Sequence, residues 1–317
     1  MELIRYLHNL KQRHRDCVVT IGNFDGVHLG HQAVIQQLNR YAKDHALPAV
    51  VIIFEPQPLE YFVPEKAPTR LSSFRKKVEW LGEHDVDMVI CLHFKANLAE
   101  LSAEQFVEEI LIKEISAKCI IVGDDFKFGK DRKGDYSLLE SMSKQISFKL
   151  ASTDTLFTGS ERVSSSQIRE LLSAARMSEA EALLGRPYSM IGRVIYGDKR
   201  GRKLGFPTAN IAIKRWKSPV LGVFAVKIDG LHNTVYEGVA NVGTCPVFDG
   251  KQVLLEVHIL NFDAKIYGKH LRISFLKRIR EEQKFASIKQ LQEQINLDID
   301  ATKLFFTKAK TSDVEQE

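Results

Sequence analysis

The chain has few cysteines and no long apolar run. Its 317 residues include four cysteines, and no two of them have the CxxC spacing of many metal and redox sites. No apolar segment reaches the length of a membrane span, and the first residues lack the apolar core of a signal peptide. We therefore expect a reduced, cytoplasmic protein rather than a secreted or membrane-spanning one. The cysteines are Cys17, Cys91, Cys119 and Cys245.

Neither the positive nor the negative charges are concentrated in one part of the chain. The formal net charge is +5 and 27% of the residues are charged, and acids interrupt basic stretches such as residues 130–133. A mildly basic protein suits an anionic small molecule as well as a nucleic acid. A nucleic-acid surface, however, needs clustered Lys and Arg with aromatic residues among them. We expect small-molecule ligands, no nucleic acid and no membrane; the composition leaves the oligomeric state open.

The first part of the chain alternates strand-like and helical segments. Near-continuous apolar runs are separated by helical patterns, in one of which Ser102 and Gln105 have the spacing of a capping box. This alternation predicts an α/β fold with a parallel sheet covered on both faces. Ligands of such sheets bind beyond the carboxyl ends of the strands. The strand-like runs are residues 17–21, 49–54, 87–94 and 118–123.

The character of the sequence changes near Arg186. From Ile191 onward the segments are short and β-like, with frequent turn signals, which predicts a small antiparallel barrel or sandwich. A terminal helical pattern follows over residues 287–306. We therefore expect two domains, residues 1–185 and residues 186–317.

The segment GNFDGVHLGH, residues 22–31, follows the first strand-like run. Its glycines do not have the GxGxxG spacing of a dinucleotide fingerprint. His28 and His31 could ligate zinc, but no nearby cysteine or carboxylate pair completes a ligand set. A helix that begins here offers free N–H groups to an anion, and Gly26 and Gly30 let the backbone approach a ligand. The segment therefore predicts a phosphate site with two imidazoles as added donors.

A second helix start, in SERVSSSQIRELL, has a similar polar character. Three serines, residues 164–166, open an amphipathic helical pattern, with Arg162 before them and Arg169 one turn into it. Serine caps are common at helix starts and would explain the serines alone. A cap does not require two arginines, whose guanidinium groups suit a polyphosphate. We expect a second phosphate contact here.

The segment GDKRGRKLGFPTANI, residues 197–211, places basic residues between glycines. It lacks the GxxxxGK[ST] spacing of a P-loop. The alternatives are a plain glycine-rich turn and a mobile flap over phosphates, and the interleaved basic residues favour the flap. Thr208 and Asn210 are two residues apart, so on an extended chain they point the same way. A hydroxyl and an amide there suit a hydrated Mg²⁺ and phosphate oxygens. The basic residues are Lys199, Arg200, Arg202 and Lys203, and the glycines are Gly197, Gly201 and Gly205.

Glu256 lies in the strand-like run VLLEVHIL, residues 253–260. Alternation puts Leu255 and Val257 on one face of the strand and Glu256 on the other, beside Leu254. A carboxylate in that setting fits either a half-exposed face or a general base. Alternation alone does not decide between them.

The motifs of the first part resemble a known family. GNFDGVHLGH carries the HxGH signature of nucleotidylyltransferases, and VSSSQIR resembles their ISSTxxR-type motif; FEPQP and VGDDFKFG resemble further blocks of the bacterial FAD synthetase module. The resemblance implies a Rossmann-like domain that transfers AMP from ATP to FMN. Ser166 stands where the family often has Thr, which keeps the hydroxyl. The implied ATP-binding residues are Gly22, Phe24, His28, His31, Asp125, Arg162, Ser165, Ser166 and Arg169, with His28 and His31 catalytic.

GFPTAN and LEVHIL resemble the riboflavin kinase family, which has a small β-barrel. The same family is also resembled by two further segments, GVANVGTCPVFDG and RIREEQKFASIKQLQEQI. The resemblance implies that Glu256 is the catalytic base and that Thr208 and Asn210 bind Mg²⁺ and ATP. Cys245 and Val247 depart from the NIGTRPT that the family commonly has. Gly197, Lys203 and Gly205 are further implied ATP-binding residues.

Together the two resemblances imply a bifunctional riboflavin kinase and FMN adenylyltransferase. It would phosphorylate riboflavin to FMN with ATP, then adenylylate FMN to FAD and release pyrophosphate, with Mg²⁺ in both steps. The first domain alone would also fit a nucleotidylyltransferase acting on a pantetheine or glycerol phosphate, but the GFPTAN segment argues against it. A non-catalytic nucleic-acid-binding protein is the other alternative, and it gives Glu256 no role.

Overall fold

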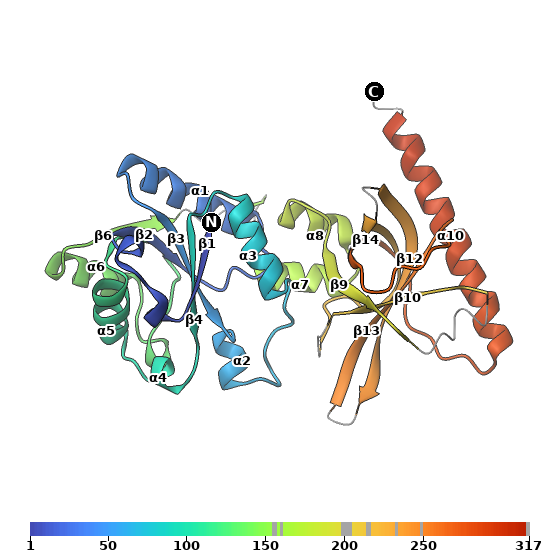
Figure 1. Ribbon diagram of the computed structural model, residues 1–317, viewed down its shortest axis with the longest axis horizontal. Coiled ribbons are helices and arrows are strands. Elements are labelled where there is room, and N and C mark those ends of the chain that lie inside the picture. Colours follow the sequence, from blue (N-terminus) through green and yellow to red (C-terminus); the bar gives the residue numbers. More distant parts are fainter. Residues whose placement is uncertain are drawn as a thin grey trace. The chain divides into compact units, whose positions relative to one another are not determined.

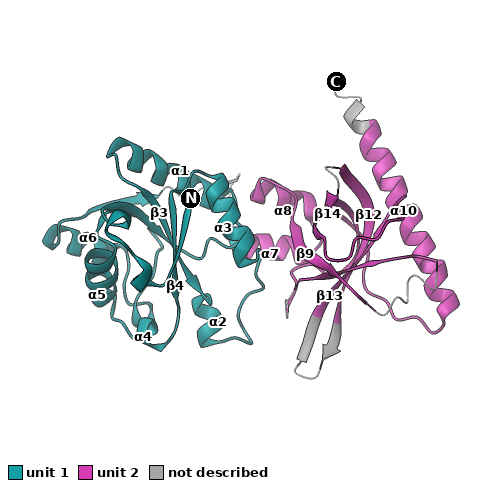
Figure 2. Cartoon of the chain, viewed as in Figure 1, with its two compact units in different colours: residues 1–165 teal, residues 166–317 magenta. Residues whose placement is uncertain are grey.

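The structure is a computed structural model. It describes residues 1–153, 157–158, 161–197, 205–213, 217–231, 234–247 and 250–314, except for the side chains of 157–158, 161–162, 245–247, 250–252 and 312–314. Contacts divide the chain into two compact units, Met1–Ser165 and Ser166–Glu317 (Figure 2). This division precedes helix α8 (Met177–Leu184), whereas the sequence-based boundary near Arg186 follows it. That boundary stays a prediction, and each unit is described by itself.

The first unit is built on a six-stranded parallel sheet (Figure 1). The strand order is β1-β4-β3-β2-β5-β6, and every adjacent pair is parallel. This confirms the predicted α/β class, and the four predicted runs form β2 to β5. The edge strands were missed because both are short and carry charged or polar residues. The strands are β1 (Glu2–Arg5), β2 (Cys17–Ile21), β3 (Ala49–Glu55), β4 (Met88–His93), β5 (Ala117–Gly123) and β6 (Lys149–Thr153).

Helices and short turns connect these strands. The capping box predicted at Ser102 is confirmed: its Oγ accepts the Gln105 N–H at 3.2 Å, and its N–H donates to Gln105 Oε1 at 2.9 Å. The helix that follows soon widens into a π-helix, which the residue pattern does not distinguish from an α-helix. The helices are α1 (Leu29–Asp44), α2 (Pro58–Phe62), α3 (Phe74–Glu83), α4 (Ala96–Ala99), α5 (Ala103–Gln105), the π-helix η3 (Phe106–Glu114) and α6 (Tyr136–Gln145). The remaining elements are η1 (Leu7–Asn9), η2 (Gln12–His14), η4 (Lys130–Arg132), β7 (Phe157–Thr158) and β8 (Glu161–Arg162).

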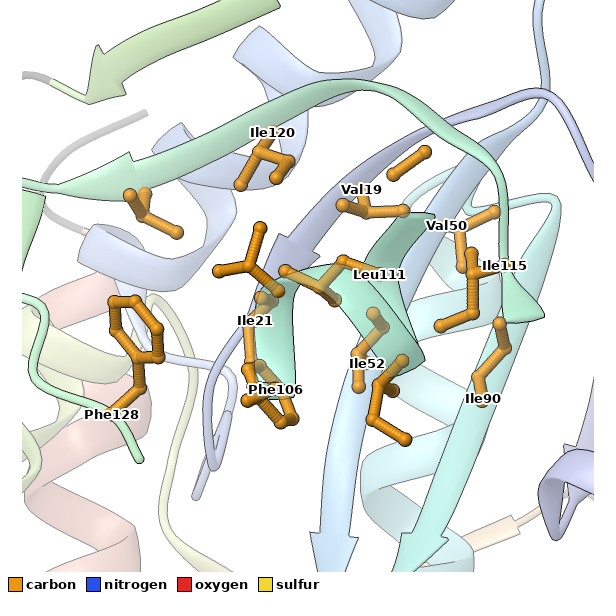
Figure 3. Close-up of a cluster of buried hydrophobic side chains, with 14 of the residues drawn as sticks. Val19, Ile21, Val50, Ile52, Ile90, Phe106, Leu111, Ile115, Ile120 and Phe128 are labelled. Atoms are coloured by element: carbon orange, nitrogen blue, oxygen red, sulfur yellow. The ribbon is translucent and has the colours of Figure 1, made fainter. Parts of the chain in front are cut away.

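The sheet is covered on both faces because alternate strand residues point to opposite sides. On one face, Ile21 and Ile52 pack with Leu111 of η3 (Figure 3). On the other face, Val18 and Val51 belong to a cluster with residues of α1 and α3. Both clusters are buried, so the strands read as continuous apolar runs. This packing fixes where β2 ends, and therefore where the loop to α1 begins.

Three thiols are buried in the strands of this sheet. Cys17, Cys91 and Cys119 are free cysteines of β2, β4 and β5. Burial raises the pKa of Cys17 to about 12 and those of Cys91 and Cys119 to about 11. The side chain of Cys245 lies outside the described residues.

The second unit holds a closed antiparallel barrel, which confirms the prediction and selects a barrel over a sandwich. The strand order around it is β10-β13-β12-β11-β14-β9. Inward-facing residues such as Leu255 and Val257 are fully buried. Helix α7 (Ser165–Ser173), whose first residue belongs to the first unit, and helix α8 precede the barrel. The strands are β9 (Ser189–Ile195), β10 (Ala209–Ala212), β11 (Gly222–Leu231), β12 (Thr234–Val247), β13 (Gly250–Ile259) and β14 (His270–Arg280).

The terminal helix α10 (Ile288–Val314) packs on the barrel and is longer than the predicted 287–306. Ile299 joins a buried cluster with Val223 and Val239 of the strands. An ion pair adds to this packing: Arg280 Nε and Nη2 both donate to the Asp298 carboxylate, at 2.8 and 2.9 Å. The Asp298 side chain is 5% exposed and that of Arg280 is 16% exposed. The pair therefore ties the end of β14 to α10.

We expect Asp298→Ala to lower the free energy of unfolding of the second unit by about 2 kcal/mol. The change leaves the Arg280 guanidinium partly buried without its carboxylate, and breaking such a pair from one side is costly. Asp300→Ala is the matched control, because Asp300 is an exposed acid two residues along the same helix. Urea unfolding of the full chain measures both variants. Equal stability of the two would contradict a role for the ion pair.

Candidate active sites

A cavity of about 410 Å³ lies at the carboxyl ends of β2, β5 and β6 in the first unit. In the strand order, β2 has β3 on one side and β5 on the other, so the cavity lies where the direction of the chain across the sheet reverses. Open α/β sheets bind their ligands at such a point. The lining residues are Thr20, Ile21, Gly22, Phe24, His28, Gly30, His31, Val34, Gly123, Asp125, Phe126, Thr153, Val163, Ser164 and Ser165.

The two histidines of GNFDGVHLGH lie at the N-terminus of α1. His28 is the N-cap residue, and its Nδ1 accepts the His31 N–H at 3.3 Å. An imidazole nitrogen that accepts a hydrogen bond carries no proton, so in neutral His28 the proton lies on Nε2. The two rings stack with centroids 3.6 Å apart. The geometry places two imidazole rings and the N-terminus of a helix at one cavity.

The loop before α1 approaches the cavity closely because of its glycines. Gly26 has a φ of 83°, a conformation that glycine adopts without strain. A Cβ on Gly30 would lie 3.2 Å from the His28 ring and 3.2 Å from the Val163 carbonyl oxygen. A side chain at Gly30 would therefore push the imidazole away from its place. Phe24 is buried and its ring lies 4.9 Å from that of His31, which holds the His31 ring from the other side.

Only part of the predicted second phosphate contact can be placed. Ser165 lines the cavity, and its Oγ donates to the Asp25 carbonyl oxygen at 3.1 Å. Ser166 and Arg169 belong to the second unit, and the side chain of Arg162 lies outside the described residues. Their ATP contacts therefore stay predictions. Asp125 also lines the cavity, near Gly123: a Cβ on that glycine would lie 2.9 Å from Asp125 Oδ1.

Sequence reasoning missed several residues of this cavity. Thr20, Thr153 and Phe126 line it, and each lies at or just beyond the end of a strand. The rule that ligands bind at carboxyl ends of strands could have found Thr20, which lies one residue before the end of β2. It could not have found Thr153, because β6 itself was not predicted.

An aromatic cluster was also missed. It lies at the ends of β3 and β4, where the rings of Phe54 and Phe94 meet at 5.7 Å and Tyr61 and Phe62 of α2 each lie 5.6 Å from Phe94. Tyr61 is 40% exposed and Phe62 is 58% exposed. The four rings form one cluster, and its two members on α2 are open to solvent. The signal in the sequence was the pair of aromatic residues, Tyr61 and Phe62, that lies three residues after the end of FEPQP.

FEPQP itself forms an ion-pair cluster. Arg70 donates to both Glu55 oxygens, at 3.1 and 2.6 Å, and also pairs with Glu60. Burial raises the pKa of Glu60, but hydrogen bonds from Arg70 and from the Gln57 N–H outweigh it and hold that pKa below its usual value. The cluster fixes the start of α2, and therefore the aromatic residues that α2 carries.

A second cavity, of about 260 Å³, lies in the second unit. Gly197, Thr208 and Asn210 line it together with the segment 262–267. A Cβ on Gly197 would lie 2.3 Å from the Asn210 amide nitrogen, so a side chain there would displace the Asn210 amide. Gly205 is exposed with a φ of 90° and does not line the cavity. Lys203 and the other basic residues of the expected flap, Lys199, Arg200 and Arg202, lie outside the described residues.

Glu256 lies on the outward face of β13, as alternation predicted. It is half-buried, while Leu255 and Val257 on either side of it are fully buried. In register, Glu256 lies between Asn210 of β10 and Asn241 of β12. It does not line the 260 Å³ cavity, but its cross-strand neighbour Asn210 does. The carboxylate is therefore one strand away from the Thr208–Asn210 segment.

His258 shares the outward face with Glu256 and was not predicted as a site residue. Its Nδ1 lies 2.9 Å from the Pro207 carbonyl oxygen. A carbonyl only accepts, so this nitrogen carries the proton. The ring also meets Phe206 edge-on at 6.3 Å. His258 thus anchors the GFPTAN segment to β13.

Two known families match successive parts of this chain. The FAD synthetase family matches residues 10–167, and the riboflavin kinase family matches residues 184–306. A protein of Escherichia coli (strain K12), named bifunctional riboflavin kinase/FMN adenylyltransferase, is 44% identical over 311 residues, 98% of this chain and 99% of that protein. The chain belongs to the bifunctional riboflavin kinase/FMN adenylyltransferase family. The member of the same name from Haemophilus influenzae is 43% identical over 306 residues, 96% of this chain and 99% of that protein.

A solved structure supports the fold of this riboflavin kinase/FMN adenylyltransferase family member. The crystal structure of a macrolide-efflux protein from Streptococcus pneumoniae has a TM-score of 0.80 and 30% identity, covering 95% of this chain and 98% of that chain. The name of that protein differs from the family name, and the likeness supports the fold alone. Of the helices in the described part of the chain, none combines the length and hydropathy of a bilayer span.

Two departures from the riboflavin kinase pattern cannot be assigned a structural effect. Cys245 and Val247 stand on β12 where the family commonly has Arg and Thr. Their side chains lie outside the described residues. Gly243, on the same strand, is in contact range of Glu282: a Cβ there would lie 2.3 Å from the Glu282 Oε1 atom.

Proposed function

We propose that this chain makes FAD from riboflavin in two ATP-dependent steps, one in each unit. The kinase step converts riboflavin to FMN, and the adenylyltransferase step converts FMN to FAD with release of pyrophosphate. The observation that carries the proposal is the pairing of two cavities with two motif sets. HxGH and Ser165 line one cavity, and the Thr and Asn of GFPTAN line the other.

In the adenylyl step, the attacking group is the phosphate of FMN. An FMN phosphate oxygen bonds to the α-phosphorus of ATP, and the bond from that phosphorus to the pyrophosphate oxygen breaks. The nucleophile is already an anion, so the step needs positioning and charge stabilisation rather than a base. His28, His31 and the start of α1 supply donors for the charge that builds up on the leaving pyrophosphate. Ser165 and Asp125 belong to the same cavity in this proposal.

The aromatic cluster supplies a place for the flavin ring of FMN. Phe54, Tyr61, Phe62 and Phe94 lie at the ends of β3 and β4, on the same edge of the sheet as the phosphate cavity. Stacking on these rings would hold the isoalloxazine while its phosphate extends toward the donors of α1.

In the kinase step, the attacking group is the neutral 5′-hydroxyl of riboflavin. Glu256 takes the proton from this hydroxyl as its oxygen bonds to the γ-phosphorus of ATP and the bond to ADP breaks. The half-buried position of Glu256 beside Asn210 supports this role, because the base must lie near the phosphates yet remain open to the acceptor. Gly197, and in this proposal also Gly205 and Lys203, belong to the ATP side.

Mg²⁺ is part of the proposal for the kinase site. Thr208 and Asn210 offer a hydroxyl oxygen and an amide oxygen to one cavity, which fits a cation that takes one or two protein oxygens and keeps several waters. When bound, Mg²⁺ would neutralise charge on the phosphate oxygens of ATP. The protein residues orient the nucleotide and hold the base. We place the enzyme in the cytoplasm, where riboflavin and ATP are its partners.

Product analysis tests the proposal directly. Purified protein with riboflavin, ATP and Mg²⁺ is expected to form FMN first and FAD later, with pyrophosphate appearing together with FAD. Supplying FMN in place of riboflavin should give FAD alone. A protein that forms neither FMN nor FAD would overturn the proposal, and steeply salt-dependent DNA or RNA binding without turnover would favour the nucleic-acid alternative.

A further inference from the structure

A buried acid in GNFDGVHLGH has no role in the reaction described above. Asp25 is 2% exposed. Its Oδ2 accepts the Leu71 N–H at 2.9 Å, and its Oδ1 accepts the Ser72 N–H at 3.0 Å. A carboxylate that binds two successive backbone N–H groups is held in one orientation. Asp25 therefore fastens the loop after β2 to the segment that leads into α3.

Ser72 closes this contact from the other side. Its hydroxyl donates to Asp25 Oδ1 at 3.2 Å and accepts the Gly26 N–H at 3.1 Å. Ser72 is also 2% exposed, so water does not compete for these bonds. The hydroxyl thus connects the side chain of Asp25 to the backbone of the next residue, and the loop cannot shift without breaking a buried hydrogen bond.

The same loop carries unusual backbone conformations. Phe24 and Val27 have φ values of 45° and 41°, and Gly26 has 83°. Non-glycine residues rarely adopt such angles unless the surrounding structure holds them there. The hydrogen bonds of the Asp25 carboxylate and of the Gly26 N–H lie between Phe24 and Val27, so they help to hold the backbone in these conformations. His28 follows directly, and the position of its ring depends on the path of this backbone.

Asp25 also reaches the second helix start. Its carbonyl oxygen accepts the Ser165 hydroxyl at 3.1 Å. One residue therefore joins three segments: the loop to α1, the segment 71–72 and the first residue of α7. All three belong to the first unit.

A buried lysine, Lys77, interacts electrostatically with Asp25. Lys77 of α3 is fully buried, and its Nζ has no hydrogen-bond partner among the described residues. Burial lowers the pKa of Lys77, and the negative charge of Asp25 acts in the opposite direction. The negative charge of Asp25 thus favours the protonated form of this lysine, which lies on the helix that follows residues 71–72.

We propose that Asp25 and Ser72 are positioning residues for adenylyl transfer, which hold His28 and Ser165 in the arrangement that the ATP phosphates require. The inference rests on the proposed function of the first cavity. It assigns to Asp25 and Ser72 no contact with substrate. Their effect passes through the backbone of the loop and through the Ser165 hydroxyl.

The test compares two adjacent serines in the full-length protein. Ser72→Ala removes the hydroxyl that binds Gly26 and Asp25, and we expect kcat for conversion of FMN to FAD to fall about 10- to 100-fold, the range produced by a small misplacement of reacting groups. KM for ATP should change much less. Riboflavin phosphorylation, measured in the same preparation, should stay at the wild-type rate.

Ser73→Ala is the matched control. Ser73 is the N-cap of α3, and its Oγ accepts the Lys76 N–H at 3.3 Å, so its loss lowers stability without touching the loop. Ser72→Thr keeps the hydroxyl and should retain more kcat than Ser72→Ala. Thermal unfolding of each variant separates loss of stability from loss of rate.

The possible outcomes separate this inference from the proposed function. If the wild-type protein makes FAD and Ser72→Ala does so at the same kcat, the inference is wrong and the proposed function stands. It is also wrong if Ser73→Ala loses as much kcat as Ser72→Ala. A wild-type protein that makes no FAD from FMN would overturn the proposed function, and this inference with it.

Discussion

Glu256→Gln is expected to lower riboflavin phosphorylation about 10²- to 10⁴-fold, the usual contribution of a general base, and to leave conversion of FMN to FAD intact. Gln has nearly the shape of Glu but cannot accept the proton of the riboflavin hydroxyl. The adenylyl step keeps its rate because its nucleophile is already ionised and because the cavity with His28 and His31 lies in the first unit, whereas Glu256 belongs to the second. Separate assays with riboflavin and with FMN, each followed by separation of flavins, measure the two rates.

Asp229→Asn is the matched control for Glu256. Asp229 is a half-buried acid of β11 in the same barrel, and β11 does not adjoin β13 in the strand order. Its replacement removes one negative charge from the barrel without changing the Thr208–Asn210 region. If the Glu256→Gln variant phosphorylates riboflavin at the wild-type rate, Glu256 is not the base. Equal losses in both variants would point to net charge rather than proton transfer.

His28→Ala and His31→Ala are expected to make FMN accumulate. Each removes an imidazole from the cavity at the start of α1, and loss of one donor to developing charge typically costs about 10²- to 10³-fold in kcat. The kinase step should continue, so riboflavin is consumed while FAD formation lags. A time course of FMN and FAD from riboflavin measures this directly.

Two further variants sharpen the histidine experiment. His28→Asn keeps a side-chain acceptor at the N-cap but removes the ring N–H; activity near wild type would show that His28 only caps the helix. His45→Ala is the control, because His45 is exposed at the opposite end of the same helix. FAD formation that survives both His28→Ala and His31→Ala would exclude the imidazoles from the adenylyl step.

The parts of the fold that sequence predicted are those set by local pattern. β2 to β5 are buried on both faces and therefore appear as apolar runs, and the barrel strands are marked by closely spaced turns. β1 and β6 lie at the edges, where half of each strand is open to solvent and the run is interrupted. The π-helix of η3 was not predicted, because π-helices are rare and no residue type in this segment marks the i→i+5 hydrogen bonds.

In the candidate sites too, sequence predicted only what a local pattern marks. The histidines and the Thr208–Asn210 pair were found because motif and spacing are local. The bonds from Asp25 to Ser72 join residues 47 positions apart in the chain, and no local pattern indicates them. Likewise, alternation gave the face of Glu256, but its alignment with Asn210 and Asn241 depends on the register of three strands.

The burial of the three thiols of the sheet affects how they react with oxidants. Reduced flavins pass electrons to oxygen, and the peroxide that results attacks thiolates far faster than thiols. With pKa values of about 11 to 12, Cys17, Cys91 and Cys119 hold almost no thiolate at neutral pH. Buried and almost entirely protonated, these three thiols of the first unit are poor targets for such oxidants.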